Sequence, residues 1–295
     1  MLKKTALDTV RTVADLRARI SAWRANGESV GLVPTMGALH EGHLSLVRRS
    51  QAMVSRTVVS VFVNPKQFAP TEDFSVYPRD EAGDAVKLAA QGADLLFAPN
   101  VEQMYPAGSV TQISVPGIGD ILEGEFRPGF FTGVATIVTK LLLQSLPDIA
   151  VFGEKDYQQL QVIKRMTADL DIPVRIEGAP TVREENGLAK SSRNTYLSPE
   201  EQGIAPFLFR VLNKVALRVA SGYPVLDTER QGREELLAAG FNKVDYLGVR
   251  HAQDLSPVDI FAPPLRVLAA AWLGRTRLID NIEIDDTKTS TAVGK

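Results

Sequence analysis

The sequence predicts an α/β protein: a Rossmann-like parallel sheet with helices on both faces, followed by a smaller C-terminal α+β domain. Over the first 180 residues, short apolar runs alternate with amphipathic runs of helical spacing. These strands read as continuously apolar, which is typical of parallel sheets that are covered on both faces. After residue 180, the pattern changes to two helical stretches followed by three strands.

The first part contains five expected strands and four expected helices. Val58–Val63 reads as a strand from its β-branched content, and Thr132–Leu146 reads as a helix because its apolar residues recur at helical spacing. The other expected strands are Val30–Val33, Asp94–Ala98, Ile149–Phe152 and Val174–Ile176, and the other expected helices are Leu44–Arg49, Asp84–Gln91 and Tyr157–Leu170.

The second part is expected to contain helices followed by strands. A chain of 295 residues exceeds the usual size of a single core, so we predict two domains, residues 1–181 and 182–295. The polar residues 285–295 are expected to fray. The expected elements are helices over Pro199–Ser221 and Leu226–Gly240 and strands over Val244–Arg250, Arg266–Trp272 and Arg277–Ile282.

Composition narrows the class of protein. A net charge of −2 gives no electrostatic reason to expect nucleic acid or an anionic membrane as a partner. No apolar run approaches the roughly 20 residues that span a bilayer, and Asp8, Arg11 and Asp15 interrupt any signal-peptide core after the N-terminal lysines. The absence of cysteine excludes disulfides and thiolate sites. We therefore expect a cytoplasmic protein.

Three polar clusters each follow an apolar strand directly. They are His40–His43, Asn64–Gln67 and Gly153–Asp156. In open α/β sheets, ligands bind beyond the carboxyl ends of the strands, where the strand order reverses. We therefore expect the three clusters to share one crevice.

The first cluster reads as strand, glycine-rich turn and helix. Gly37 and Gly42 let the backbone approach a ligand, and His43 lies where unpaired N–H groups and the helix dipole favour a phosphate. A zinc site would need histidines at i and i+4, whereas His40 and His43 are at i and i+3, and the only other histidine, His251, falls in the second domain. The alternative is a pair of surface histidines at a helix start.

Lys155, Asp156 and Gln159 share one face of the helix that follows the third cluster. Lys155 is expected to contact phosphate oxygens, and Asp156 is expected to hold Mg²⁺ together with ATP phosphates, although an acidic residue in a first turn is often only a cap. The amides of Gln67 and Gln159 can hold a carboxylate or a hydroxyl without adding charge, the alternative being solvated side chains.

Other residues near these clusters have open interpretations. Asn64 is either a site residue or a turn former, and Arg127 makes either a loop salt bridge or an anion contact. The long stretch Asn64–Asp80 has three prolines and no regular period, which favours a functional loop. Its aromatic residues Phe68, Phe74 and Tyr77 argue against disorder.

Lys190–Asn194 offers two cations and two hydroxyls, a suitable clamp for departing pyrophosphate. It could also be an ordinary polar loop, and its serines have no histidine base nearby in the sequence. Its position at the domain junction suggests a hinged lid. A chain that carries this loop and the histidine turn is expected to transfer an adenylyl group.

Taken together, these motifs resemble the pantothenate synthetase (pantoate–β-alanine ligase) family. The likeness runs from about Val30 to Leu197 and resumes at Ala271–Gly274 and Arg277–Asn281. Its motifs are Pro34–His43, Phe62–Pro65, Gln67–Phe68, Tyr77–Arg79, Phe152–Leu160 and Ser191–Asn194.

The resemblance implies membership of the nucleotidyltransferases related to class I aminoacyl-tRNA synthetases. It implies that pantoate attacks the α-phosphorus of ATP to give pantoyl adenylate and pyrophosphate, and that β-alanine then displaces AMP to give pantothenate. It also implies Mg²⁺ and a homodimer.

The resemblance also implies the site residues. Catalytic residues are His43 as proton donor, His40, Lys155 and Arg193, and Asp156 is the Mg²⁺ ligand. Gln67 holds pantoate and lies near β-alanine, Gln159 holds pantoate, and the remaining substrate-binding residues are Asn64, Tyr77 and Arg127. The ATP site comprises Met36, Gly37, Ala38, Leu39, His40, Glu41, Gly42, His43, Gly153, Glu154, Lys155, Asp156, Val182, Lys190, Ser191, Ser192 and Arg193.

Two positions depart from the common family pattern. Phe130 stands where histidine is usual, and Lys190 stands where methionine or leucine is commoner. Two other functions remain as alternatives: a nucleotidyltransferase with a different substrate, and a non-catalytic nucleotide-binding module. The former would not need Gln67 and Gln159 as an uncharged pocket, and the intact set of histidines, lysine and arginine argues against the latter.

Overall fold

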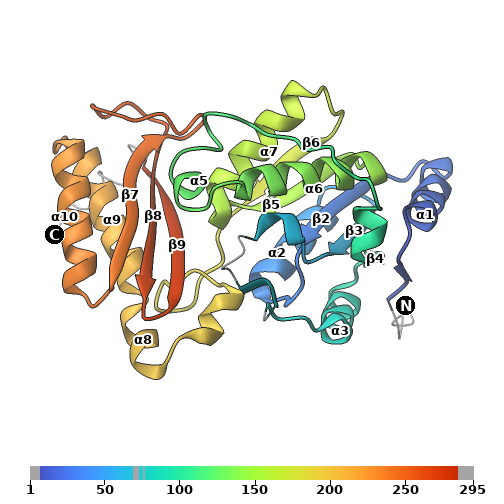
Figure 1. Ribbon diagram of the computed structural model, residues 1–295, viewed down its shortest axis with the longest axis horizontal. Coiled ribbons are helices and arrows are strands. Elements are labelled where there is room, and N and C mark those ends of the chain that lie inside the picture. Colours follow the sequence, from blue (N-terminus) through green and yellow to red (C-terminus); the bar gives the residue numbers. More distant parts are fainter. Residues whose placement is uncertain (1–6, 69–72, 76, 285–295) are drawn as a thin grey trace. The chain divides into compact units, whose positions relative to one another are not determined.

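The computed structural model describes residues 7–68, 73–75 and 77–284 (Figure 1). The chain forms two compact units. The first unit contains the chain up to Glu154 and the segment Gln159–Pro180, and the second contains Lys155–Gln158 and the chain from Thr181 onward. The tail predicted over residues 285–295 lies outside the described residues.

The first unit is built on a six-stranded parallel sheet with the order β1-β4-β3-β2-β5-β6. This confirms the predicted Rossmann-like sheet. Its strands are β1 (Thr9–Val10), β2 (Val30–Thr35), β3 (Arg56–Val61), β4 (Leu95–Phe97), β5 (Ile149–Gly153) and β6 (Arg175–Ala179).

Helices cover both faces of this sheet because its central strands are apolar on both sides. Val33 and Val59 pair in register and join one core cluster, while their neighbours Leu32 and Val58 point to the other face and are equally buried. Helix α2 packs on β2, β3 and β5 and against α3, whereas α1 packs against α6 (Figure 1). The helices are α1 (Val13–Ala25), α2 (Glu41–Gln51), α3 (Glu81–Gln91), α4 (Val101–Met104), α5 (Glu123–Phe126), α6 (Phe130–Ser145) and α7 (Tyr157–Asp169).

The strand order reverses between β2 and β5. From β2 the chain proceeds through β3 and β4 on one side, whereas β5 pairs with the other side of β2 and is followed by β6. The carboxyl ends of β2 and β5 therefore flank the position where ligands bind in such sheets. Residues 36–43 and 153–154 follow those two ends, in agreement with the sequence analysis.

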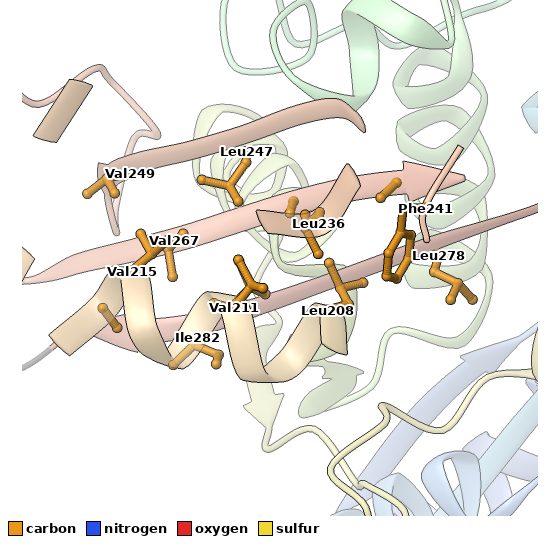
Figure 2. Close-up of a cluster of buried hydrophobic side chains, with 14 of the residues drawn as sticks. Leu208, Val211, Val215, Leu236, Phe241, Leu247, Val249, Val267, Leu278 and Ile282 are labelled. Atoms are coloured by element: carbon orange, nitrogen blue, oxygen red, sulfur yellow. The ribbon is translucent and has the colours of Figure 1, made fainter. Parts of the chain in front are cut away.

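The second unit contains a three-stranded antiparallel sheet with two long helices packed on it (Figure 2). Its elements are α8 (Pro199–Ile204), α9 (Phe207–Ala220), α10 (Val225–Ala238), β7 (Lys243–His251), β8 (Leu265–Leu273) and β9 (Thr276–Ile284). Alternate residues of the strands meet the apolar face of the helices, and the core includes Leu208, Val211, Val215, Leu236, Leu247, Val249, Val267, Leu278 and Ile282.

The prediction of one unbroken helix over Pro199–Ser221 is wrong. Helix α8 ends at Ile204, and Pro206 is the N-cap of α9. Proline has no N–H to donate to the preceding turn, so a new helix begins after it. Strand β1 and helices α1, α4 and α5 were not predicted.

Candidate active site

The chain after β2 turns through a left-handed path. Gly37 has φ of 83° and Ala38 has φ of 51°. A Cβ at position 37 would lie 3.1 Å from Asp84 Oδ2 and 3.2 Å from a methyl carbon of Val61, so both space and conformation favour glycine there. Thr35 Oγ1 anchors the turn, accepting from the Gly37 N–H at 3.3 Å and donating to the Ser60 carbonyl at 2.9 Å.

Two side chains of α3 bind the backbone of this turn. The Leu39 N–H donates to Asp84 Oδ1 at 2.7 Å, and Lys87 Nζ donates to the Leu39 carbonyl at 2.8 Å. Asp84 is fully buried, and Lys87 Nζ lies 3.7 Å from its carboxylate. Asp84 and Lys87 were not predicted as site residues, because an acid and a lysine three positions apart are typical of any polar helix face.

His40 and His43 form the N-terminal cap of α2. His40 Nδ1 accepts from the Gly42 N–H at 3.1 Å, and His43 Nδ1 accepts from the His40 N–H at 3.3 Å. The two ring centroids are 4.1 Å apart. Because each Nδ1 accepts a hydrogen bond, each neutral ring carries its proton on Nε2. Each ring can therefore donate from Nε2 beside the positive end of the helix dipole.

Gln67 and Asn64 lie beside the turn after β2. Gln67 Nε2 lies 2.7 Å from Met36 Sδ, and Asn64 Nδ2 donates to Gln67 Oε1 at 3.0 Å. Asn64 Oδ1 accepts from the Lys66 N–H at 3.3 Å, so the side chain of Asn64 caps the turn that follows it. The Tyr105 hydroxyl donates to the same oxygen at 2.8 Å. Burial raises the pKa of Tyr105 to about 12, so this phenol is protonated at neutral pH.

Arg127 takes the salt-bridge option that the sequence left open. Its guanidinium lies 3.3 Å from Glu123 Oε1 and donates to the Gln67 carbonyl at 3.2 Å. The guanidinium carbon also lies 3.8 Å from the centroid of the Phe130 ring. Arg127 therefore holds the backbone of Gln67, which is a positioning contact.

The aromatic residues of the stretch Asn64–Asp80 form a cluster. The Phe68 ring centroid lies 5.3 Å from that of Phe74 and 5.6 Å from that of Tyr77. Residues 69–72 and residue 76 of this stretch lie outside the described residues. Gln159 is half-buried in the first turn of α7.

The candidate residues Lys155, Asp156, Val182 and Lys190–Arg193 belong to the second unit. Lys155 and Asp156 lie in a short 3-10 helix, η3 (Glu154–Asp156), and Lys155 Nζ is 3.7 Å from Asp156 Oδ1. The Lys190 N–H donates to the Val182 carbonyl at 2.9 Å.

Ser191 begins the next 3-10 helix, η4 (Ser192–Tyr196). Its hydroxyl accepts from the N–H of Arg193 at 3.3 Å. The hydroxyl of Ser191 thus acts as a helix cap, which orders the loop that carries Arg193.

No group of three histidine, aspartate or glutamate side chains that could hold a metal ion occurs in the part of the chain that the structure describes. The carboxylate of Asp156, which was predicted to hold Mg²⁺ together with ATP phosphates, is about half-exposed at 47%. Over the same described residues, none of the helices is long and apolar enough to cross a membrane.

Comparison with known proteins identifies the family. The family profile described as "Pantoate-beta-alanine ligase" matches residues 8–283. A pantothenate synthetase from Paramagnetospirillum magneticum is 58% identical over 281 residues, covering 95% of this chain and 99% of that protein. The chain belongs to the pantoate-beta-alanine ligase family. It is therefore a ligase of pantothenate biosynthesis.

Solved structures agree with this assignment. A pantothenate synthetase from Thermus thermophilus is 48% identical with a TM-score of 0.89, covering 94% of this chain and 99% of that one. A pantoate-beta-alanine ligase from Francisella tularensis, complexed with beta-gamma ATP and beta-alanine, is 32% identical with a TM-score of 0.80, covering 94% of this chain and 98% of that one. The likeness therefore spans both units of the chain.

Phe130 and Lys190, which the sequence analysis singled out, each have a structural partner. Phe130 stacks under the Arg127 guanidinium and packs on Phe131 with ring centroids 4.9 Å apart. Lys190 Nζ lies 3.0 Å from Glu184 Oε2. The ammonium group of Lys190 is thus paired with a nearby carboxylate.

Gly133 of α6 lies where the structure leaves no room for a Cβ. An added Cβ would lie 2.1 Å from the Lys66 carbonyl oxygen and 2.9 Å from Gln67 Cα, which are backbone atoms that a side-chain rotation cannot move. We expect Gly133→Ala to destabilise the protein by about 1–3 kcal/mol, as overpacking usually does. Urea denaturation measures this loss.

Gly203→Ala is the matched control. Gly203 also lies in a helix, but nothing lies within 4 Å of a Cβ there. Alanine at this position should be neutral or stabilising by up to about 1 kcal/mol. An unchanged unfolding midpoint for Gly133→Ala would contradict the close packing of α6 on Lys66 and Gln67.

Proposed function

We propose that this chain condenses (R)-pantoate with β-alanine in two steps through a pantoyl-adenylate intermediate. In the first step, a pantoate carboxylate oxygen bonds to the α-phosphorus of ATP and the bond to the β-phosphate oxygen breaks, releasing pyrophosphate. In the second step, the amine of β-alanine bonds to the acyl carbon, the bond to AMP breaks and the nitrogen loses a proton. Membership of the pantoate-beta-alanine ligase family supports this reaction.

The observation that carries the proposal is the histidine cap of α2. Both Nδ1 atoms accept backbone N–H groups, so each neutral ring carries its proton on Nε2, at a helix N-terminus where a phosphate is favoured. In-line transfer at phosphorus depends on positioning and charge neutralisation more than on covalent catalysis. Hydrogen-bond donors that are already oriented toward the phosphate provide both. We assign His43 as the proton donor and His40 as its neighbour on the phosphates.

The other roles follow from the chemistry of the side chains. Lys155 and Arg193 neutralise the triphosphate and the departing pyrophosphate. Gln67 and Gln159 hold pantoate as uncharged amides, and Gln67 also lies near β-alanine. The remaining ATP contacts are those given by the family likeness: Met36–Glu41, Gly42, Gly153, Glu154, Val182 and Lys190–Ser192.

Three substrate-binding roles are less direct. Asn64 and Arg127 hold Gln67 by its side chain and its backbone, and Tyr77 packs on the neighbouring Phe68. We propose that Asn64, Tyr77 and Arg127 shape the pantoate pocket through Gln67 and Phe68. Asp156 would hold Mg²⁺, which when bound neutralises charge on the phosphate oxygens.

Domain roles, assembly and location complete the proposal. Residues 1–181 are proposed to bind nucleotide and pantoate, and residues 182–295 to act as a lid that excludes water from the reactive adenylate. Family likeness supports a homodimer. The lack of cysteine supports a cytoplasmic location.

Isotope exchange tests the two-step reaction. With Mg²⁺, ATP and pantoate but no β-alanine, the protein should transfer label from radioactive pyrophosphate into ATP. The exchange should stop when pantoate is omitted. Exchange that requires β-alanine would mean that no free adenylate forms, and exchange that is indifferent to pantoate would favour a nucleotidyltransferase with another substrate. A nucleotide-binding module would show no exchange at all.

A further inference from the structure

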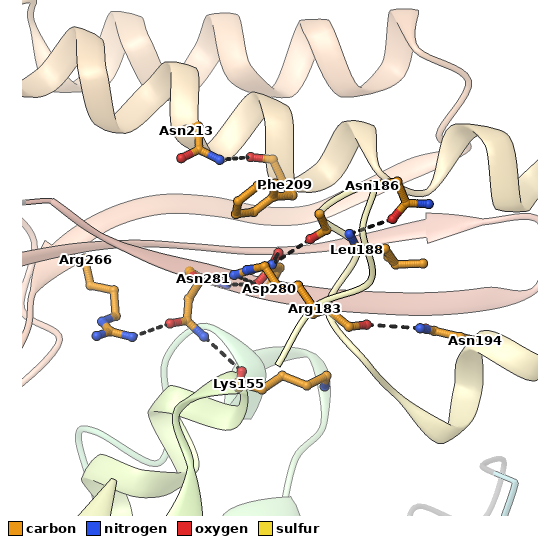
Figure 3. Close-up of polar contacts among 12 residues, drawn as sticks. Lys155, Arg183, Asn186, Leu188, Asn194, Phe209, Asn213, Arg266, Asp280 and Asn281 are labelled. Carbon is orange, nitrogen blue, oxygen red and sulfur yellow. Dashed lines mark hydrogen bonds and ion pairs between the residues drawn. The ribbon is translucent and has the colours of Figure 1, made fainter. Parts of the chain in front are cut away.

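Two adjacent residues of β9, Asp280 and Asn281, bind two separate segments of the second unit (Figure 3). Each is only 4% exposed. Successive side chains of a strand point to opposite faces of its sheet. One face of β9 therefore receives the segment around Arg183, and the other face receives the segment that contains Lys155.

Asn281 holds the backbone of Lys155. Its Nδ2 donates to the Lys155 carbonyl at 2.9 Å, and its Oδ1 accepts from Arg266 Nη1 at 2.6 Å. The Arg266 guanidinium in turn lies 3.7 Å from the centroid of the Tyr157 ring. The arginine can only donate, so it fixes the orientation of the amide and leaves the NH₂ group facing Lys155.

Asp280 holds the hairpin that leads to Lys190–Arg193. Its carboxylate takes two hydrogen bonds from the Arg183 guanidinium, at 2.6 and 2.9 Å, in a bidentate pair. Arg183 bridges to Ala189 across the hairpin, and its guanidinium also lies 4.1 Å from the centroid of the Phe209 ring. Lys190 follows directly after this bridge.

We propose that Asp280 and Asn281 are positioning residues for adenylate formation, which together set the spacing between Lys155 and the loop Lys190–Arg193. This inference rests on the proposed function, in which both segments contact the triphosphate. Because the two anchors are neighbours on one strand, a single peptide unit links the two phosphate-binding segments. In this role each residue acts through another residue: Asp280 through the side chain of Arg183, and Asn281 through the backbone of Lys155.

Asn281→Asp tests this role with almost no change of shape. The carboxylate keeps the acceptor for Arg266 but puts an oxygen in place of the NH₂ group that faces the Lys155 carbonyl. We expect pyrophosphate–ATP exchange to fall roughly ten- to a hundredfold, as when a buried partner to a polar group is lost. The reaction of preformed pantoyl adenylate with β-alanine should stay within about twofold of wild type, since pyrophosphate has already left.

Asp245→Asn is the matched control. Asp245 is a buried carboxylate of the same sheet that accepts from Arg277 Nε of β9 at 2.7 Å and from Trp272 Nε1 of β8 at 3.0 Å. Loss of the Asp245 carboxylate should lower the stability of the protein without changing the ratio between the rates of the two half-reactions. If Asn281→Asp lowers both half-reactions equally, or neither, the inference is overturned.

A double substitution separates positioning from general damage. Asn281→Asp should add less than about twofold to the defect of Lys155→Ala, because the side chain it positions is already gone. If Asn281→Asp lowers exchange as much in the Lys155→Ala protein as in the wild-type protein, the inference is overturned. If Asn281→Asp does not fold, as judged by circular dichroism, Asp280→Asn is the test instead. It should lower pyrophosphate–ATP exchange but not the reaction of preformed adenylate with β-alanine. Its effect should be non-additive with that of Arg193→Ala. Absence of exchange in the wild-type protein would instead defeat the proposed function itself.

Discussion

Replacing His43 by alanine should slow pantoyl-adenylate formation by roughly 10²–10³, the effect of removing one donor aimed at developing charge. His43 lies in the first turn of α2, and its Nδ1 accepts from the His40 N–H, so its Nε2–H is the group that donates. ATP affinity should change much less, because the contact strengthens in the transition state. Single-turnover adenylate formation at saturating ATP measures the rate.

The chain provides a matched control in its third histidine. His251 ends β7 in the second unit and is expected to tolerate alanine with a wild-type rate. A wild-type single-turnover rate for His43→Ala, with only a weaker dissociation constant for ATP, would show that His43 binds nucleotide without acting in the transition state.

Lys155→Ala and Arg193→Ala should each lower adenylate formation by roughly ten- to a hundredfold, the range for lost hydrogen bonds to charged groups. Both cations are proposed to neutralise the triphosphate and the departing pyrophosphate. The second half-reaction begins after pyrophosphate has left, so preformed pantoyl adenylate should react with β-alanine at close to the wild-type rate. Rapid-quench measurements of the two half-reactions give the comparison.

Lys164→Ala and Arg230→Ala are the charge-matched controls. Lys164 is exposed on α7, and Arg230 forms exposed ion pairs with Asp227 and Glu234 on α10, which contribute little. Both variants should behave as wild type in both half-reactions. If the Lys155 and Arg193 variants fail equally on preformed adenylate, the pyrophosphate role is wrong.

The strands were predictable where local pattern and burial agree. The apolar, β-branched runs that form β3 and β5 are buried, and their composition predicts strands. Helix α1 was missed because only Leu16 and Ile20 of its residues are buried, so its sequence carries almost no apolar stripe. The break at Pro206 was missed although proline signals it, because the apolar spacing continues across the break.

The candidate site was predictable where a motif is local. The glycine turn and the histidines are contiguous, so their chemistry can be read from spacing. The contacts that hold them are not local: Asp84 binds Leu39 from 45 residues away, and Asn281 binds Lys155 from 126 residues away. Such partners look like ordinary polar residues until the fold brings them together, because sequence spacing carries no signal at that separation.

The assignment of Lys155–Gln158 to the second unit has a consequence for the covalent architecture of the chain. The backbone passes between the units three times, at Glu154–Lys155, Gln158–Gln159 and Pro180–Thr181. A single cut therefore cannot divide the protein into two self-sufficient pieces. A fragment ending near Pro180 would keep Tyr157 but lose Ala252, whose carbonyl accepts from the buried Tyr157 hydroxyl at 2.9 Å. A fragment that ends near Pro180 would thus carry four residues, Lys155–Gln158, whose packing partners lie in the rest of the chain.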